Sequence, residues 1–510
     1  MVKLQSSHSK NMHKQKVDVL LVGAGVMSAT LGMLLTRLDP ALKIVMVERL
    51  GKVAHESTHS LNNAGTGHAG YCELNYTPQR ADGSVDISKA LKINAGFEVS
   101  LQFWSWLVEQ GVLPASHEFI NAIPHQSFVW GDKDVDFLRK RFELLHKHHL
   151  FEEMQYSEDH AKLEKWMPLV MSRRDAGQKV AATQVNHGSD IDFGSLTRHM
   201  IKALKQHHSF ELLLKHDING LKQQANGHWK VTVDDLHNKE TRQIEAAFVF
   251  LGAGGGALPL LQKTGLPEAR GYGGFPVSGQ WLICKNPDIV KKHHTKVYGK
   301  APTGAPPMSV PHLDARIIDG KPALLFGPYA GFTTKFLKEG SIFDLFSSVK
   351  PSNLKPMMSV AFDNMDLTRY LIKGALQSHK ERVAALQDFY ASAKESEWKL
   401  EDAGHRVQII KQCKSKGGRL EFGTEIITAR DGTLASLLGA SPGASISVQA
   451  MLEVLERCFK KQMHSSEWKS QLHTMIPSFG ISLDDDVALL HEVRKRTRKI
   501  LGLDFKGTAI

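Results

Sequence analysis

The chain has 510 residues, 42% of them hydrophobic, with a mean hydropathy of −0.24, which is enough for a large core and about two domains. It contains no run of about 18 apolar residues, no apolar centre in the N-terminal "MVKLQSSHSKNMHKQK" and no closely spaced cysteines. These absences argue against a membrane span, a secretory signal, a disulfide framework and a metal site, and they fit a reducing compartment. The net charge of +11 suits nucleic acid, an anionic membrane or acidic metabolites and does not distinguish them.

The first predicted elements form a βαβ unit. An apolar strand over 17–22 leads through a glycine turn into a helix over Val26–Leu38, and "ALKIVMVER" forms a second strand that ends at Glu48. An acidic residue at that strand end is placed to accept hydrogen bonds from an adenosine ribose. The unit therefore predicts a dinucleotide site, and the alternative is a strand–turn–helix without a ligand.

The turn itself reads Gly23-Ala24-Gly25-Val26-Met27-Ser28. Gly23 permits the tight turn, Gly25 allows the backbone to approach a pyrophosphate, and the helix N-terminus offers N–H groups to that anion. The third position requires only a small residue for close packing of helix and strand. Ser28 therefore weakens the fingerprint without abolishing it.

Further elements follow along the chain. "FGSLTRHMIKAL" has the apolar spacing of a helix, and Asn226-Gly227 predicts a hairpin turn between two strands. "AAFVFLGAGGGALPLL" reads as another strand, glycine turn and helix, "PALLFGPYAGFTTKF" as a strand, and 360–400 as helical. Near the end, "TLASLLGASPGASISV" precedes a long helix that Pro442 is suited to start.

Nucleotide-binding patterns thus occur at the beginning, middle and end of the chain. We predict a mixed α/β fold with a Rossmann-like domain that is assembled from separate segments and a β-sheet substrate domain inserted between them. The expected boundaries are a polar tail, 1–16; a dinucleotide-binding domain, 17–80, 180–275 and 405–460; a substrate domain, 81–179 and 276–404; and a basic helical region, 461–510.

A loop at 55–78, "HESTHSLNNAGTGHAGYCELNYTP", is rich in small polar residues. Its backbone around Asn62, Asn63, Gly65 and Thr66 is suited to approach a planar cofactor, and His68 could point into the same space. The alternative for this segment is a solvated loop.

Charged residues mark two later strands. His312 and Arg316 are four residues apart around an expected strand or turn, and Arg406 begins the apolar stretch "RVQIIK". An arginine at such a position is either a surface charge or a buried clamp for an anion, with planar, bidentate donors. Gly443 and Ala444, which precede a helix, suit an electron-rich group.

Longer strings identify a family. "NNAGTGHAGYCELNYTP", "PHQSFVWG", "GSDIDFGSLTR", "FLGAGGGALPLLQKTGLPEARGYGGFPVSGQWL" and "VPHLDARIIDGKPALLFGPYAGF" closely resemble malate:quinone oxidoreductase, an FAD flavoprotein, and the resemblance extends from Val17 to about Phe459. More distantly, "NAGTGHAG" and "GHR" resemble elements of amino-acid oxidases and L-2-hydroxyglutarate dehydrogenase. The resemblance implies an FAD-binding domain of the glutathione-reductase/amino-acid-oxidase type.

The resemblance also implies where FAD lies. The first turn would hold the pyrophosphate, Glu48 the ribose, and the backbone of Ile218 the adenine. Gly252 and Gly254 would line the cavity. Asn63 to Thr66 would approach the flavin, and the turn at Gly443 and Ala444 would stabilise negative charge on its pyrimidine side. We expect tight, non-covalent FAD, with covalent attachment through Cys72 or His68 as the alternative.

The implied reaction is oxidation of (S)-malate to oxaloacetate by hydride transfer to flavin, with electrons passed to a membrane quinone in the tricarboxylic acid cycle. Arg406 would bind the C1 carboxylate and Arg316 the other one. His312 is the preferred base, because histidines titrate near neutral pH, and His68 is the second candidate. Two alternatives are an oxygen-using 2-hydroxy-acid oxidase and a nucleic-acid-binding flavoprotein. No recognised RNA-binding motif supports the latter, so nucleic acid is not an expected partner.

A quinone is lipid-soluble, so we expect a cytoplasmic enzyme with peripheral contact to the cytoplasmic face of the membrane. The candidate segment is "LLHEVRKRTRKILGL", 489–503, in which an apolar stripe accompanies five basic residues, Arg494, Lys495, Arg496, Arg498 and Lys499. The alternative is a helix packed on the core with a solvated basic face.

Overall fold

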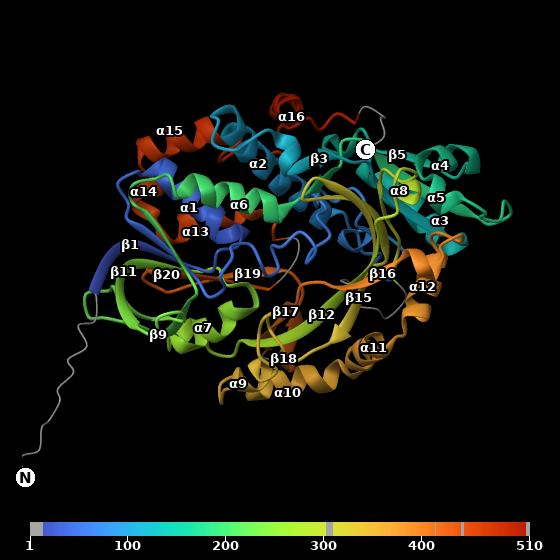
Figure 1. Cartoon of the computed structure of the whole chain (residues 1–510). Coiled ribbons are helices and arrows are strands. Elements are labelled where there is room, and N and C mark those ends of the chain that lie inside the picture. Colours follow the sequence, from blue (N-terminus) through green and yellow to red (C-terminus); the bar gives the residue numbers. More distant parts are fainter. Residues whose placement is uncertain (1–13, 302–309, 414, 440–442, 506–510) are drawn as a thin grey trace, which may run out of the picture.

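Two large sheets lie side by side in the computed structural model, which describes residues 14–301, 310–413, 415–439 and 443–505 (Figure 1). The first sheet has the order β19-β20-β11-β1-β2-β8, and the hairpin of β9 and β10 is attached to β11. Its strands are β1 (Lys14–Val22), β2 (Ile44–Glu48), β8 (Phe210–Leu214), β9 (His216–Gln223), β10 (Trp229–Asp235), β11 (Thr241–Leu251), β19 (Thr424–Thr428) and β20 (Leu434–Gly439).

The centre of this first sheet is parallel and is covered on both faces. β1 pairs in parallel with β2 and β11, and its alternate residues enter different cores: Val19 and Leu21 join one cluster, Leu20 and Val22 the other. Apolar residues throughout such a strand are typical of a parallel sheet buried on two sides. The helices above it in Figure 1 are α1 (Val26–Leu38), α2 (Ser88–Glu109), α6 (Phe193–Leu204), α13 (Ser447–Cys458), α14 (Lys460–Met463), α15 (Ser466–Met475) and α16 (Val487–Leu501), with α7 (Ala257–Lys263) on the opposite side.

The second sheet has ten strands in the order β18-β17-β12-β15-β14-β13-β4-β6-β5, with β16 paired to β12. They are β4 (His125–Trp130), β5 (Gln155–Ser157), β6 (Val180–Val185), β12 (Gly273–Cys284), β13 (Lys296–Tyr298), β14 (His312–Ile318), β15 (Lys321–Phe332), β16 (Lys399–Asp402), β17 (Arg406–Cys413) and β18 (Gly417–Glu421). A separate pair is formed by β3 (Ile120–Ala122) and β7 (Ser189–Ile191). The remaining helices are α3 (Asp132–Leu145), α4 (His160–Trp166), α5 (Pro168–Met171), α8 (Pro287–Val290), α9 (Asp344–Ser347), α10 (Leu354–Asp363), α11 (Met365–Leu376) and α12 (His379–Gln387).

Most of the predicted elements are confirmed. The helix over Val26–Leu38, the strand that ends at Glu48 and the hairpin at Asn226-Gly227 all form as expected. The final helix differs, because α13 begins at Ser447 rather than near Pro442, which itself lies outside the described residues. The mixed α/β fold class is confirmed. Three strands that lie wholly within the segments expected in the dinucleotide-binding domain, β6, β17 and β18, pair in the second sheet. The domain boundaries stay a prediction.

The basic C-terminal helix α16 lies against the core, with Leu490, Val493 and Leu501 buried. Arg494 is buried too, and its Nε donates to Glu98 Oε1 at 2.8 Å. Arg496 and Arg498 pair with Glu109 and Glu153, and only Lys495 and Lys499 of the five basic residues are exposed. The expectation that all five face lipid is therefore wrong, because the α2 carboxylate of Glu98 draws Arg494 into the core. Among the helices that the structure describes, none is both long and apolar enough to cross a bilayer.

Candidate active site

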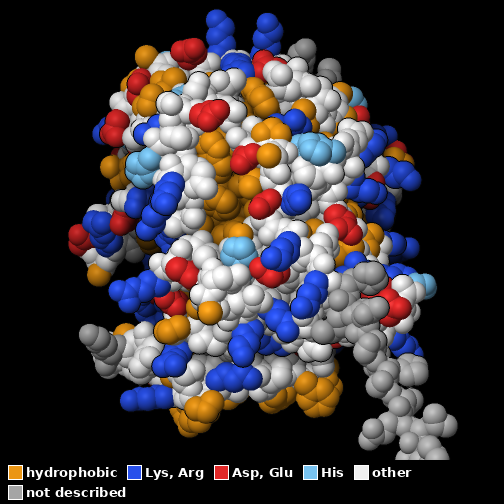
Figure 2. Space-filling model, turned by 90° about the vertical axis from the view of Figure 1, so that its left-hand side faces the viewer, with side chains coloured by type: hydrophobic (Ala, Val, Ile, Leu, Met, Phe, Trp, Pro, Cys, Tyr) orange, Lys and Arg blue, Asp and Glu red, His pale blue; other side chains and the backbone are white. Residues whose placement is uncertain are grey.

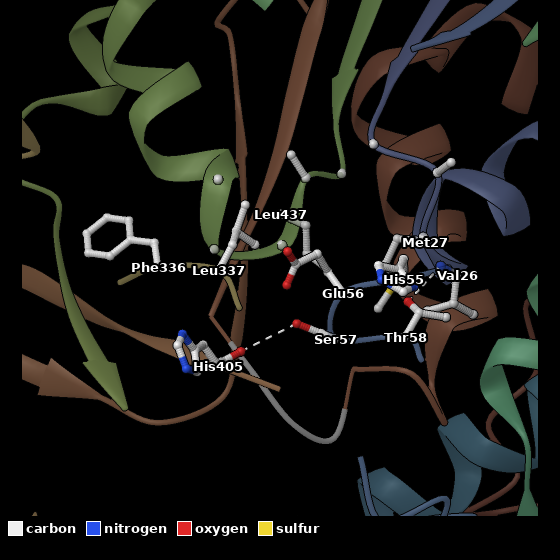
Figure 3. A pocket seen from close by; sticks show the side chains of 18 of the residues that line it. Val26, Met27, His55, Glu56, Ser57, Thr58, Phe336, Leu337, His405 and Leu437 are labelled. Carbon is white, nitrogen blue, oxygen red and sulfur yellow. Dashed lines mark hydrogen bonds between the residues drawn. The ribbon is translucent and has the colours of Figure 1, made fainter. Parts of the chain in front are cut away.

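A cavity of about 510 Å³ is lined by the β1–α1 turn, the end of β2, loop 54–68, the β11–α7 turn and the start of β17 (Figure 3). A volume of this size falls in the range of small-molecule and cofactor sites. The lining thus comes from chain segments that are hundreds of residues apart. A hydrogen bond connects two of these segments, loop 54–68 and the start of β17: the Ser57 hydroxyl donates to the His405 carbonyl oxygen at 3.4 Å (Figure 3).

The glycine turn forms one wall of this pocket. Gly23 has φ +91°, and a Cβ there would lie 2.8 Å from the carbonyl oxygen of Gly252, so only glycine fits between the two strands. Gly25 is the N-cap of α1, whose first turn holds no acidic residue and has no side-chain cap at its N-cap position. The Val26 N–H donates to Thr58 Oγ1 at 3.2 Å. The positive end of α1 therefore faces the pocket, as an anion site requires.

Ser28 is fully buried and does not line the pocket. A Cβ on Gly252 would lie 2.4 Å from its Oγ, so the serine packs directly against the glycine turn after β11. The third position of the fingerprint thus serves close packing, as expected, because Gly252 has no side chain and leaves space for the hydroxymethyl group of Ser28.

Glu48 and Ile218 both line the pocket. The Glu48 carboxylate accepts backbone N–H bonds from Ala24 and Leu50, both at 2.8 Å. Burial raises its pKa, because these two bonds and Arg49 compensate the desolvation only in part. The Ile218 carbonyl oxygen accepts from Lys263 Nζ at 3.3 Å. These two residues offer the acid and the backbone that the sequence predicted for an adenosine.

Asn62 and Asn63 shape loop 55–66 with their side chains. Asn63 Nδ2 donates to the carbonyl oxygens of Ser57 and His59, and its Oδ1 accepts from the Gly65 N–H at 2.9 Å. Asn62 Nδ2 donates to the Glu56 carbonyl oxygen at 2.8 Å. With these side chains engaged within the loop, both residues present mainly their backbone to the pocket, and they position Gly65 and Thr66 on its wall.

Arg316 supports the same loop from behind and is fully buried. Its Nε lies 2.6 Å from Asp190 Oδ1, and Nη1 donates to the Asn63 carbonyl oxygen at 2.8 Å. A Cβ on Gly65 would lie 2.2 Å from the Arg316 guanidinium, so a glycine is needed above it. The expected role of Arg316 as a second carboxylate clamp is wrong for this structure, because its donors are engaged and it does not line the pocket.

Arg406 is placed differently. It lines the pocket at the start of β17, and its side chain has no hydrogen bond or ion pair with another residue in the described part of the chain. Burial lowers its pKa, and nearby Tyr298 opposes that effect. A guanidinium stays charged at any physiological pH and is costly to bury alone. Arg406 therefore presents an uncompensated positive charge to the pocket.

His68 lines the pocket and is held by two neighbours. Its Nδ1 lies 2.6 Å from Glu73 Oε1, and its backbone N–H donates to Ser445 Oγ at 3.0 Å. Burial would raise the pKa of Glu73, yet the bond to His68, the charges of His68 and His125 and a backbone hydrogen bond together outweigh it, and the pKa is lowered. A carboxylate on Nδ1 leaves Nε2 as the basic nitrogen. His68 thus has the environment of a proton acceptor.

His312 lies in β14, is 4% exposed and is absent from the pocket wall. Its Nδ1 is 2.8 Å from Asp314 Oδ2, and its ring stacks on Tyr298 with centroids 4.1 Å apart. Tyr298 OH in turn hydrogen-bonds to Thr66 Oγ1 at 2.7 Å. His312 therefore lies one layer behind the wall, where it backs the Tyr298–Thr66 contact.

Several supporting residues escaped the sequence reasoning. Lys296 is fully buried, and its Nζ lies 2.9 Å from Asp190 Oδ1 and 3.5 Å from Asp314 Oδ2. Burial would raise the pKa of Asp314, but His312 and Lys296 together hold it at about 2. Asp190 and Asp314 do occur in the motifs "GSDIDFG" and "VPHLDAR", yet no local spacing shows that they meet a lysine from β13.

Ser445 was also missed, although it belongs to the predicted turn after Ala444. Its Oγ donates to the Thr66 carbonyl oxygen at 3.1 Å and accepts from the His68 N–H. Gly443, Ala444 and Ser445 all line the pocket. This one hydroxyl links the C-terminal turn to the 55–78 loop, so the two flavin-directed segments of the prediction do come together.

Known proteins resemble the chain over nearly its full length. The family model described as malate:quinone oxidoreductase matches residues 15–503. A probable malate:quinone oxidoreductase from Hahella chejuensis is 63% identical over 97% of this chain and 100% of its own. One from Methylobacillus flagellatus is 62% identical over 95% of this chain and 98% of its own.

Solved structures share the fold at low sequence identity. L-alpha-glycerophosphate oxidase from Mycoplasma pneumoniae with FAD bound superposes with a TM-score of 0.56 at 15% identity, covering 87% of this chain and 95% of that one. Glycine oxidase from Geobacillus kaustophilus gives 0.56 at 14% identity, covering 88% and 95%. The chain thus shares its fold with these two oxidases, and it belongs to the malate:quinone oxidoreductase family.

Proposed function

We propose that this protein binds FAD in the cavity between its two sheets, oxidises (S)-malate to oxaloacetate and passes the electrons to a membrane quinone. The single observation that carries the substrate assignment is Arg406, a half-buried guanidinium that lines the pocket without a counter-ion among the described residues. The chain belongs to the malate:quinone oxidoreductase family, and malate carries the carboxylates that this guanidinium is suited to bind.

The residues present fit FAD. A Cβ would clash at Gly23 and at Gly252 and would lie 3.1 Å from Thr58 Oγ1 at Gly25, and the α1 N-terminus beside this cradle suits a pyrophosphate. Glu48 lines the same pocket at the end of β2, which supports its role as the ribose acceptor. Gly65, Thr66 and the turn at Gly443 and Ala444 suit a flat ring. When bound, FAD supplies the two-electron acceptor that malate oxidation requires.

The chain's own residues then have two tasks. Arg406 binds the carboxylate next to the reacting carbon, because its planar fork matches that group in a bidentate pair. His68, rather than His312, removes the proton of the substrate hydroxyl, since it lines the pocket and Glu73 fixes its Nδ1 proton. Hydrogen bonds from Tyr298 through Thr66 and Ser445 to His68 hold this part of the wall together, and Tyr298 is near enough to Arg406 to influence its pKa, which supports the joint action of Arg406 and His68.

The acceptor separates this proposal from an oxygen-using 2-hydroxy-acid oxidase. A lipid-soluble quinone requires the enzyme to work at a membrane, and we place it peripherally on the cytoplasmic face. The test is the absorbance of the purified yellow protein without oxygen. Malate should bleach the flavin bands and a short-chain quinone should restore them within seconds. Absence of bleaching by malate contradicts the substrate, and recovery with air but not with quinone contradicts the acceptor.

A further inference from the structure

Helices α9, α10 and α11 expose an unusual concentration of large hydrophobic side chains at the lower edge of the molecule (Figure 1). Ten of the sixteen exposed large hydrophobic residues in the described part of the chain fall within 342–376. The most exposed are Leu376 at 78%, Phe362 at 68% and Phe343 at 66%. We call this set the 342–376 patch; its members are Ile342, Phe343, Phe346, Val349, Leu354, Met358, Phe362, Met365, Ile372 and Leu376.

The helices of the patch have their apolar residues on the solvent side. In α10, Leu354, Met358 and Phe362 are spaced by four residues on an exposed face, whereas only Pro356 and Val360 are buried. In α11 only Leu371 is buried, and Met365, Ile372 and Leu376 are exposed. A helix that only covers a core has its apolar stripe turned inward. The outward stripe therefore requires an apolar surface outside the chain.

Basic side chains accompany the patch. Lys350, Lys355 and Lys373 are exposed beside its apolar residues, and Figure 2 shows lysine or arginine side chains next to hydrophobic ones at the lower edge. Two exposed acids, Asp363 and Asp366, share the surface, and Asp366 Oδ1 lies 3.4 Å from Arg369 Nη1. The net positive charge is thus small, and apolar insertion must provide most of the attraction.

The patch also adjoins the active-site pocket. Phe336, Leu337, Gly340, Ser341 and Asp344 line the pocket, and the exposed Ile342, Phe343 and Phe346 alternate with them along the chain. The wall of the cavity and the patch are therefore parts of one segment. A quinone reaches the pocket from the membrane, so the surface that binds the membrane is expected to lie close to the pocket.

We propose that the 342–376 patch inserts into the interface of an anionic bilayer. The proposal rests on the proposed quinone acceptor, and it replaces α16 as the membrane contact. An apolar face with phenylalanines and flanking lysines matches the chemistry of acyl chains beneath anionic headgroups. A second copy of the chain, related by twofold symmetry, would place the same net positive surface against itself, whereas anionic headgroups would neutralise it.

The first experiment is flotation of the full-length, FAD-loaded protein with vesicles of phosphatidylglycerol and phosphatidylethanolamine. The variant Phe343→Gln/Phe346→Gln/Phe362→Gln should reduce vesicle binding at least tenfold. Its matched control replaces three exposed hydrophobic residues elsewhere, Leu144→Gln/Leu236→Gln/Ile481→Gln, and should stay within twofold of the wild type. Both proteins should retain malate oxidation with a soluble acceptor, which shows that they are folded.

The second experiment needs no substitution. Hydrogen exchange of the wild type, with and without these vesicles, should slow in 342–376 and remain unchanged in α16. Three results would each overturn the proposal. The triple variant could bind vesicles as well as the wild type does, exchange could slow only in α16, or the wild type could fail to bind vesicles. A triple variant that changes only from dimer to monomer would identify a second copy as the occupant. Vesicle binding without malate-dependent bleaching would instead contradict the proposed function and leave the surface assignment standing.

Discussion

His68 Nδ1 and Glu73 Oε1 lie 2.6 Å apart at the wall of the pocket that also contains Arg406. Glu73 is almost fully buried, so its charge is compensated chiefly by this imidazole. The pair resembles the orientation device of other histidine bases, in which a carboxylate fixes the tautomer. His312 and Asp314 form a second such pair at 2.8 Å, but behind the wall.

The two histidines can be distinguished by substitution. We expect His68→Ala to slow malate-dependent flavin reduction about a hundredfold, the usual scale for loss of a general base. His312→Gln should have a smaller effect, because it acts only through Tyr298. Rapid-mixing absorbance at 450 nm, about the usual flavin maximum, measures both. Normal bleaching in His68→Ala together with its loss in His312→Gln would assign the base to His312.

Arg406→Lys should lower kcat/KM for malate by about a hundredfold or more, because an ammonium cannot form the bidentate pair of a guanidinium. FAD content should be unchanged, since the proposed pyrophosphate site is at the N-terminus of α1. Arg198→Lys is the control, as Arg198 forms an exposed pair with Asp319. Steady-state kinetics with a soluble acceptor provide the measurement. An equal loss in both variants would remove Arg406 from the substrate site.

Gly65→Ala should be much more destabilising than Gly83→Ala. Both glycines have positive φ, +60° and +83°, so alanine costs about 1–2 kcal/mol at either site. Only at Gly65 would the new Cβ lie 2.2 Å from Arg316, whereas nothing lies within 4 Å at Gly83. The melting temperature should fall much further in Gly65→Ala than in Gly83→Ala, and FAD retention should decline only in Gly65→Ala. Similar melting temperatures would show that Arg316 moves aside easily.

Acid precipitation should release the yellow cofactor into the supernatant. Cys72 is fully buried and does not line the pocket, and burial raises its pKa well above the usual range, so its thiol is a poor nucleophile for covalent attachment. His68 lines the pocket, yet its Nδ1 is engaged by Glu73. Colour that stays with the precipitate would show a covalent bond, and Cys72→Ser and His68→Ala would then identify its site.

Stability should fall as the pH is lowered from about 6.5 toward 4. Burial lowers the pKa of His125, His187 and His293 to about 4 in the folded chain, whereas an unfolded histidine titrates near 6.5. Between these values the unfolded chain binds more protons, so the free energy of unfolding decreases as the pH falls.

One of these histidines provides a direct test. His293 Nε2 donates to the Leu313 carbonyl oxygen at 3.1 Å, a bond that glutamine is suited to replace. His293→Gln should reduce the pH slope of the unfolding free energy by up to about 1.4 kcal/mol per pH unit. His237→Gln, at an exposed position, should leave the slope unchanged. Denaturant unfolding at pH 7, 6 and 5 measures it, and parallel slopes would contradict the prediction.

Local signals in the sequence were sufficient for the first βαβ unit. Val26–Leu38 forms a helix over the predicted residues, and the Asn226-Gly227 hairpin forms as expected. Apolar periodicity and the backbone freedom of glycine act over a few residues, so neighbouring residues alone specify these elements. The glycine cradle and Glu48 follow from the same unit, because the loop after β1 and the end of β2 meet at one edge of a parallel sheet.

Tertiary structure alone decided the roles of the arginines. Arg316 and Arg406 both stand on strands and both looked suitable as clamps, yet Arg316 meets Asp190 from β7, whereas Arg406 faces the cavity without an ion-pair partner in the described chain. The sequence placed Arg494 in a basic stripe suited to lipid, whereas in the structure it forms an ion pair with Glu98 of α2. Sequence by itself determined which residues carry charge and where strands and turns form. Which charge stays uncompensated depends on residues far away in the chain, because Coulomb attraction and burial act through space and not along the sequence.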